Sequence, residues 1–295
     1  MFELERAYWS GFFKRLFGKG NTPVAPVNTL QKPVEPPKTL YTEFDPQDTL
    51  PDAIFGGFDE SFDMQGFFER KGSYLATYKV GGKGVPQIIN DACKPYNVNQ
   101  KYIMILLQKE MGSWSLQDVT KLKSHSVFTR YKDSNGNYVK KADGTFDRKE
   151  FVINPVEWCL GFGVPDDDPP NPRFQGFDNQ ITNCARRVRQ LFDQGPSQVG
   201  KKFRTLGYTV LTDALLKGRT DAVKKQMAIN QKIHLDYVKE FGLELSGDPE
   251  KYIVVTLKNN WAWLLYMYTP HVGAQKLTHK LWNQEWANDL NLYRA

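Results

Sequence analysis

The sequence predicts a mainly helical α+β protein: a helical domain with a small β-hairpin insertion, preceded by an N-terminal helix and a proline-rich linker. Three observations predict this class. Apolar residues recur at helical spacing over most of the chain after residue 80. The pairs Asn135-Gly136 and Asp143-Gly144 stand between aromatic and β-branched residues, which is typical of hairpin turns. Prolines recur between residues 21 and 38, which indicates an extended linker.

The first 20 residues are expected to form an amphipathic anchoring helix. Its wide apolar stripe consists of Phe2, Leu4, Tyr8, Trp9, Phe12, Phe13, Leu16 and Phe17. Such a helix docks on a protein partner or on its own domain, or it lies in a membrane interface, and the sequence leaves these alternatives open. The proline-rich linker and an irregular arm then cover residues 21–79.

The main domain is expected at residues 80–295. Its first helix covers "VPQIINDACKPYNV" and stops at Lys94-Pro95. Asn97 or Asn99 then caps the next helix, which carries Glu110.

A hairpin is expected within residues 124–153, and a loop rich in proline and aspartate follows it. Helical spacing returns in "QITNCARRVRQLFDQG". Further helices are expected around 213–241, around 251–267 and in the C-terminal segment. The predicted order is therefore helices, a small β insertion, and helices again.

Charge and composition narrow the classes of function. Lys and Arg number 39 against 33 Asp and Glu, which gives a net charge of +6 and favours an anionic partner such as nucleic acid, a membrane surface or a bacterial wall. Because no nucleic-acid-binding motif accompanies these basic side chains, specific nucleic-acid recognition is not expected. No apolar run reaches the roughly 18 residues of a membrane span.

Several further features bear on location and chemistry. The N-terminal residues lack the basic-then-apolar order of a secretory signal, so an extracellular role would depend on cell lysis or on delivery by a particle. The odd number and wide spacing of Cys93, Cys159 and Cys184 favour reduced thiols. The histidines show no metal-ligand spacing, and neither a metal nor a cofactor is expected.

Glu110 is the candidate catalytic residue. On a helix it shares a face with the apolar residues Ile103, Leu106 and Leu107. The apolar surroundings and the negative end of the helix dipole both disfavour the carboxylate, so they should raise the pKa of Glu110. A carboxyl group that keeps its proton near neutral pH can act as the general acid of glycoside cleavage. In the alternative hypothesis, Glu110 turns into solvent and pairs with Lys109 or Lys121.

Three segments occur in order across residues 96–286: "YNVNQKYIMILLQKEMG", then "LGFGVPDDD" with "FQGFDNQITNCARRVR", then "NNWAWLLYMYTPHVGAQKLTHKLWNQEW". Together they resemble a family of bacterial and phage wall-degrading proteins related to lytic transglycosylases and goose-type lysozymes. The resemblance implies a lysozyme-like fold with Glu110 as the catalytic acid. It also implies that Asn179 and Gln180 contact sugar, and that Tyr266, Tyr268 and His271 line the opposite wall of a cleft.

The resemblance implies a peptidoglycan-cleaving enzyme, a lytic transglycosylase or a lysozyme-type glycoside hydrolase. Its substrate would be the MurNAc-GlcNAc β-1,4 bond of a glycan strand, and a single carboxyl group that gives and then takes back a proton would suffice. We expect the protein in a phage virion or tail, or in the host cytoplasm before release, with action at the cell wall during host entry. Residues 1–38 would contact other virion subunits. The alternative is a structural virion or tail component without turnover.

Overall fold

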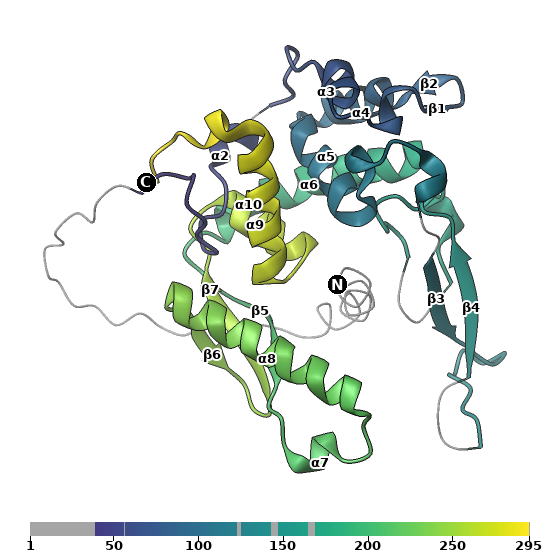
Figure 1. Cartoon of the computed structure of the whole chain (residues 1–295), viewed down its shortest axis with the longest axis vertical. Helices are drawn as coiled ribbons and strands as arrows, with labels where there is room; N and C mark the ends of the chain where they lie inside the picture. Colours follow the sequence, from purple (N-terminus) through teal and green to yellow (C-terminus); the bar gives the residue numbers. More distant parts are fainter. Residues whose placement is uncertain (1–38, 56, 123–124, 143–146, 165–168, 295) are drawn as a thin grey trace, which may run out of the picture. The chain divides into compact units, whose positions relative to one another are not determined.

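The computed structural model describes residues 39–294 except 56, 123–124, 143–146 and 165–168, so the predicted helix at 1–20 lies outside the described residues (Figure 1). The described chain is mainly helical α+β with small antiparallel sheets, which confirms the predicted class at that level. No helix in this part of the chain is both long and apolar enough to cross a membrane.

The described residues form two units, each assembled from separate stretches of the chain. The first unit holds Ser61–Ala92 and Leu106–Cys184. The second unit holds the described residues of Pro37–Glu60, Cys93–Ile105 and Ala185–Ala295. Residues 80–295, expected to form one domain, are therefore distributed over both units.

The helices of the first unit include those on either side of the predicted hairpin. They are α3 (Met64–Arg70), α4 (Val85–Cys93), the end of α5 (Gln100–Met111) and the beginning of α6 (Phe177–Gln194). The two-residue strands β1 (Lys79–Val80) and β2 (Lys83–Gly84) pair just before α4. Helix α4 ends directly before Lys94-Pro95, as predicted.

The boundaries of α5 follow from two local signals in the sequence. Asn99 caps its beginning, because the Oδ1 atom accepts a hydrogen bond from the Lys101 N–H at 3.0 Å. Asn97 instead adopts the left-handed conformation (φ 49°) at the end of the preceding turn. Gly112 (φ 64°) ends α5 and donates its N–H to the Gln108 carbonyl at 2.8 Å. The predicted cap and terminator are confirmed.

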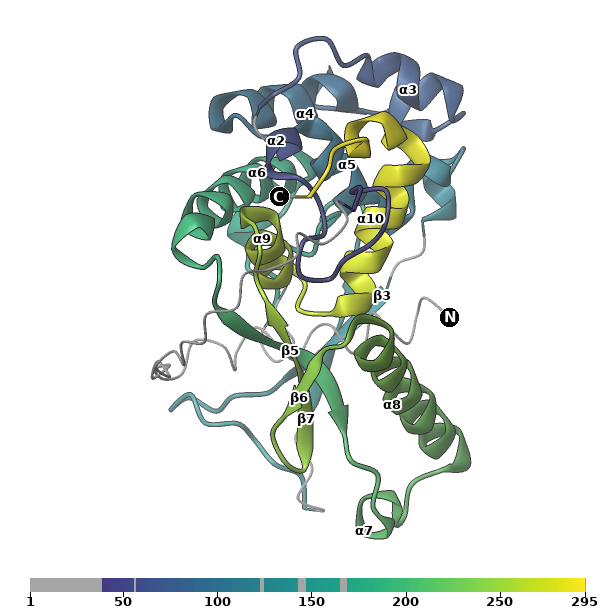
Figure 2. The same cartoon turned by 90° about the vertical axis from the view of Figure 1, so that its left-hand side faces the viewer.

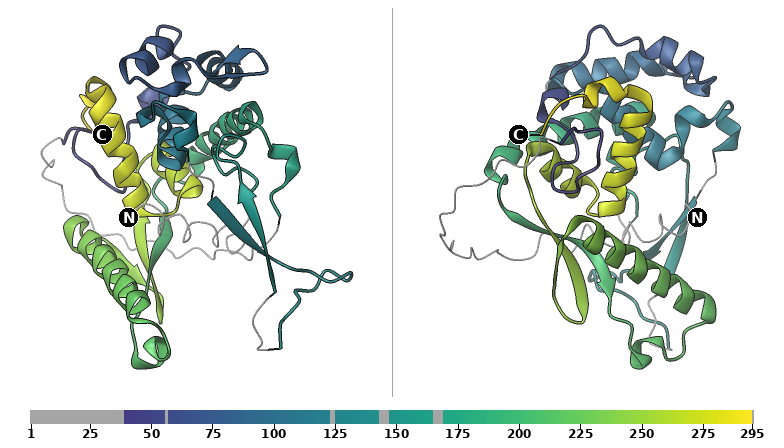
Figure 3. Two further views of the ribbon diagram at one scale, coloured as in Figure 1. Left: turned by 45° about the vertical axis from the view of Figure 1, so that its right-hand side comes forward. Right: turned by 60° about the vertical axis from the view of Figure 1, so that its left-hand side comes forward.

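The predicted hairpin consists of β3 (His125–Arg130) and β4 (Arg148–Ile153), which are antiparallel (Figure 3). A turn follows β3, where the Asp133 Oδ1 atom accepts from the N–H groups of Asn135 (2.8 Å) and Asn137 (2.9 Å). The turn at Asn135-Gly136 is therefore confirmed. Asp143-Gly144 lies outside the described residues.

The second unit contains an antiparallel sheet that was not expected from the sequence. Its strands are β5 (Lys202–Thr209), β6 (Glu244–Ser246) and β7 (Glu250–Thr256), in the order β5-β7-β6. The prediction of a helix around 251–267 is wrong in its first half, which forms strand β7. The second half is helical and forms α9 (Asn260–Tyr268). The run Ile253-Val254-Val255-Thr256 is β-branched throughout, which favours a strand.

The basic helix expected around 213–241 is divided into α7 (Asp213–Leu216) and α8 (Asp221–Phe241). Thr220 caps α8, because its Oγ1 atom accepts from the Val223 N–H at 3.4 Å. Tyr237, Val238 and Phe241 of α8 pack on the buried cluster around Ile253, and α8 runs beside the sheet in Figure 1.

The aromatic core of the second unit is centred on Trp261 of α9, which is fully buried. Its ring meets those of Phe55 and Tyr102 edge-on, with centroids 4.8 Å away in each case. Phe55 comes from α2 (Asp52–Phe55), and Trp282, whose centroid is 6.0 Å from that of Trp261, comes from α10 (Val272–Trp286) (Figure 2). Side chains of this size supply much of the apolar burial that stabilises a domain.

Candidate functional site

Glu110 lies in the last turn of α5, directly before Met111 and the terminator Gly112. Its residue is half-buried, whereas the three residues predicted to share its face, Ile103, Leu106 and Leu107, are at most 1% exposed. The carboxyl-bearing residue is therefore neither sealed in the core nor fully in solvent. A proton donor needs this combination of apolar surroundings and access to a ligand.

Two ionisable neighbours define the electrostatics around Glu110. Burial lowers the pKa of Lys109 to about 8, and the charge of Glu110 opposes that shift. Burial, followed by the nearby Cys184, raises the pKa of the Cys159 thiol, and Glu110 adds to the effect. Cys159 therefore stays a neutral thiol. Lys109 is a cation whose charge acts on Glu110, and it is one of the two lysines that the alternative hypothesis names as partners of Glu110.

The chain after Glu110 is fixed to the end of α5. The Gln108 side chain accepts from the Trp114 N–H at 3.0 Å and donates to the Ser115 Oγ atom at 2.8 Å. The Trp114 side chain is buried and meets the Phe67 ring edge-on, with centroids 5.5 Å apart. These contacts hold the backbone on the C-terminal side of Glu110 in place.

Gln180 supports the loop that precedes α6. Its Oε1 atom accepts from the N–H groups of Leu160 (3.3 Å) and Phe162 (2.9 Å). Its Nε2 atom donates to the carbonyls of Phe162 (2.8 Å) and Phe174 (2.6 Å). Gln180 is fully buried, and these four bonds use the full capacity of its amide. This corrects the expected sugar contact, because a sugar hydroxyl would have to displace a main-chain partner.

Gln180→Ala is expected to destabilise the protein by about 2–4 kcal/mol, because buried main-chain groups lose their partners. Urea unfolding followed by tryptophan fluorescence measures this change. The neighbouring Asn179 is exposed, and its Nδ2 atom donates to the Gln175 carbonyl at 2.9 Å. Asn179→Ala is the matched control, with an expected cost below about 0.5 kcal/mol. A Gln180→Ala protein of unchanged stability that no longer binds walls would restore the ligand-contact role.

The other predicted wall of the cleft belongs to the second unit. Tyr266 is fully buried and donates its hydroxyl to the Pro46 carbonyl at 3.0 Å, and burial raises its pKa. Tyr266 is therefore a core residue, which corrects its expected role as a sugar contact. Tyr268 is half-buried at the end of α9, and His271 is buried at the beginning of α10, with its ring centroid 6.5 Å from that of His234. Sugar contact by these two residues stays a prediction.

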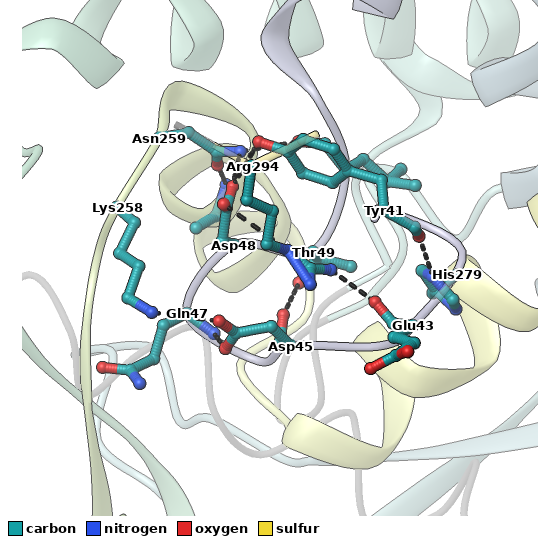
Figure 4. Close-up of polar contacts among 12 residues, drawn as sticks. Tyr41, Glu43, Asp45, Gln47, Asp48, Thr49, Lys258, Asn259, His279 and Arg294 are labelled. Atoms are coloured by element: carbon teal, nitrogen blue, oxygen red, sulfur yellow. Dashed lines mark hydrogen bonds and ion pairs between the residues drawn. The ribbon is translucent and has the colours of Figure 1, made fainter. Parts of the chain in front are cut away.

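A second polar cluster in the same unit was not anticipated from the sequence (Figure 4). Asp48 is 5% exposed, and its Oδ1 atom accepts from the Tyr41 hydroxyl at 2.8 Å and from the Asn259 Nδ2 atom. The Arg294 Nε atom lies 3.6 Å from the Asp48 Oδ2 atom. Burial raises the pKa of Asp48, and the bond from Tyr41 and the charge of Arg294 oppose this shift.

The cluster around Asp48 joins the two ends of the described chain. The Tyr41 N–H donates to the Leu292 carbonyl at 3.0 Å, and the Arg294 N–H donates to the Thr39 carbonyl at 2.9 Å. The His279 Nε2 atom lies 2.7 Å from the Tyr41 carbonyl oxygen. Since these contacts are all made within the protein, we interpret the cluster as a structural clasp.

Comparisons of this chain with protein-family models, with curated proteins and with solved structures find no match. Among the described residues, no group of His, Cys, Asp or Glu is arranged to hold a metal ion. The candidate site consists of Glu110 and the two groups that interact with it electrostatically, Lys109 and the thiol of Cys159. Gln180 supports it indirectly, because it holds the main chain of Leu160, the residue after Cys159. These residues all belong to the first unit.

Proposed function

We propose that the protein is a peptidoglycan-cleaving enzyme in which Glu110 is the catalytic acid. The observation that carries this proposal is the half-buried Glu110 at the end of a helix whose neighbouring apolar residues are buried. The choice of peptidoglycan rests on the resemblance of the three ordered segments to wall-degrading proteins. The net charge of +6 supports it, because bacterial walls carry anionic groups.

In the proposed reaction, Glu110 donates its proton to the oxygen of the MurNAc-GlcNAc β-1,4 bond. The bond breaks as positive charge develops on the MurNAc ring. The Glu110 carboxylate then removes the proton of the 6-hydroxyl of the same sugar, whose oxygen closes on C1 and leaves a 1,6-anhydro ring. The Lys109 ammonium stabilises the carboxylate between these two proton transfers, since opposite charges favour the ionised form.

Mass spectrometry of purified walls digested by the protein tests this proposal. We expect 1,6-anhydro products. Products heavier by one water would indicate hydrolysis and a lysozyme-type enzyme, with Glu110 still the acid. No release of sugars from several wall types would contradict the proposal and favour the structural virion component.

The proposed setting is a phage particle that carries the enzyme to the wall. The aromatic residues of 1–20 and the proline-rich stretch up to residue 38 support attachment to another virion subunit. The enzyme would then act at the bacterial cell wall during host entry.

A further inference from the structure

Helix α8 exposes apolar side chains that the core of the second unit does not use. Val238 and Phe241 of α8 pack on the buried cluster around Ile253, whereas Ile229 is 42% exposed and Ile233 is 40% exposed. Two side chains four residues apart lie next to each other on a helix, so the isoleucines form one patch. A contiguous apolar patch on a protein surface is typical of a binding surface.

The patch continues toward the beginning of α8 as an uncharged stripe. Four residues that are separated by four, three and four positions share this side of the helix: Ala222, Gln226, Ile229 and Ile233. We call them the α8 stripe. The Gln226 Nε2 atom donates to the Asn230 Oδ1 atom at 2.9 Å, so the polar member of the stripe has a partner within the helix. A spacing of this kind is the seam along which one helix packs on another.

The first 20 residues of the chain carry an apolar pattern that matches the stripe. Phe2, Trp9 and Phe13 are separated by seven and four positions, which is also the separation of the first, third and fourth residues of the α8 stripe. These three aromatic residues of the predicted helix can therefore pack along the stripe in one register. Large aromatic side chains gain most from being removed from water, so they favour such packing.

The charges beside the stripe favour a parallel arrangement of the two segments. Lys225 flanks the beginning of the stripe, and Asp236 and Glu240 follow its end on the same side of the helix. The charged residues of 1–20 have the complementary order, with both acids before most of the bases: Glu3, Glu5, Arg6, Lys14, Arg15 and Lys19. Asp236 and Glu240 each already lie near one lysine ammonium, at 2.7 Å and 3.0 Å, and a carboxylate can accept a second cation. Such surface pairs add little affinity, but they select the direction.

The described chain begins near the end of α8. Phe44 follows Thr39 by five residues, and its ring meets that of Phe241, the last residue of α8, edge-on with centroids 5.3 Å apart. Residues 21–38 join this point to residues 1–20, and an extended proline-rich stretch of that length spans up to roughly 55 Å. Helix α8 is about 32 Å long, so this linker reaches every part of the stripe. A tethered segment has an effective concentration of about millimolar, which favours the chain's own segment over a second copy.

We propose that the α8 stripe binds residues 1–20 of the same chain as a parallel helix. This contact removes the aromatic residues of that segment from water before the chain joins a particle. Attachment to another virion subunit would then exchange one apolar partner for another. The inference does not depend on wall cleavage or on Glu110.

Hydrogen exchange of the full chain, followed by mass spectrometry, tests the proposal. Peptides from residues 1–20 should exchange about 10-fold or more slowly than an unstructured peptide of the same sequence. Ile229→Asp with Ile233→Asp should bring their exchange to within about 2-fold of the unstructured rate, because two charges then stand in the stripe. Ala228→Asp with Leu235→Asp is the matched control, since both residues are exposed and lie on another side of α8. Slow exchange should persist in the control.

A disulfide between Phe13→Cys and Ile233→Cys is a second test, which introduces no charge into the stripe. The two positions face each other in the proposed register, and the three native cysteines are buried, so mild oxidation with oxidised glutathione reports on the introduced pair. We expect a crosslinked monomer, identified by mass spectrometry of digested peptides. Phe13→Cys with Leu235→Cys is the control, because Leu235 is also 40% exposed but lies on another side of α8. It should not crosslink.

Four outcomes would overturn the proposal. Fast exchange of residues 1–20 in the unsubstituted chain would show that the stripe does not bind them. Slow exchange that persists in the Ile229→Asp and Ile233→Asp protein would place the segment elsewhere. Crosslinked dimers in place of monomers would make a second copy the partner. Slow exchange that appears only after vesicles of phosphatidylglycerol and phosphatidylcholine are added would assign residues 1–20 to a membrane interface.

Discussion

Glu110→Gln is expected to lower the rate of wall cleavage by about 10²–10⁴-fold or more while the protein stays folded. The amide has nearly the shape of the carboxyl group but cannot give a proton to the glycosidic oxygen. Because the residue is only half-buried, the exchange leaves the packing of α5 intact. The measurement is release of soluble fragments from purified walls, with circular dichroism as the check on folding.

Glu69→Gln is the matched control for this experiment. Glu69 is an exposed residue of α3, and its side chain accepts a hydrogen bond from the Gln65 Nε2 atom at 2.7 Å. The same chemical change there should leave cleavage unaltered. A Glu110→Gln protein that still cleaves walls at the rate of the control would remove Glu110 from the mechanism.

Asp48→Ala is expected to destabilise the protein by about 3–5 kcal/mol, because it leaves the buried partners of a carboxylate without their acceptor. The groups affected are the Tyr41 hydroxyl, the Asn259 amide and the Arg294 guanidinium. The melting temperature should fall by roughly 10 °C, which differential scanning calorimetry can measure.

Asp236→Ala is the control for Asp48→Ala. Asp236 is exposed and lies 2.7 Å from the Lys232 ammonium on α8, so its loss should cost only about 0.3–0.5 kcal/mol. Equal losses at the two sites would show that the clasp contributes no more than a surface ion pair.

The effect of Asp48→Ala should also depend on pH. Because burial raises the pKa of Asp48 above 3.8, the folded state keeps a proton that the unfolded state has already lost. Stability from this group is therefore largest below pH 3.8 and is lost as pH rises through the folded pKa. The difference in unfolding free energy between the unsubstituted protein and Asp48→Ala should shrink over the same window. A difference that grows with rising pH would contradict this sign.

The features of the fold that were predicted correctly are determined by residues that are close together in the sequence. The cap at Asn99, the terminator at Gly112 and the turn at Asn135-Gly136 each need only a few positions in the chain, and the structure confirms all three. Strand β7 was missed because a short apolar run fits either a strand or a buried helix, and only its β-branched residues favour the strand.

The candidate site was predictable to a smaller extent, because burial depends on distant segments. The residue type of Gln180 shows that it can form hydrogen bonds, but only the fold determines that main-chain groups take all of them. The cluster around Asp48 joins residues that are more than 200 positions apart, such as Asp48 and Asn259. No local pattern in the sequence could indicate such an arrangement.

The pairing of Leu40 with Tyr293 brings the beginning and the end of the described chain to one corner of the second unit. A short glycine-rich peptide could therefore join residue 39 to residue 294. New termini could then be opened at the exposed Gly218, in the connection between α7 and α8. Such a circular permutant would keep the clasp, because the backbone hydrogen bonds of Tyr41 to Leu292 and of Arg294 to Thr39 would be unchanged.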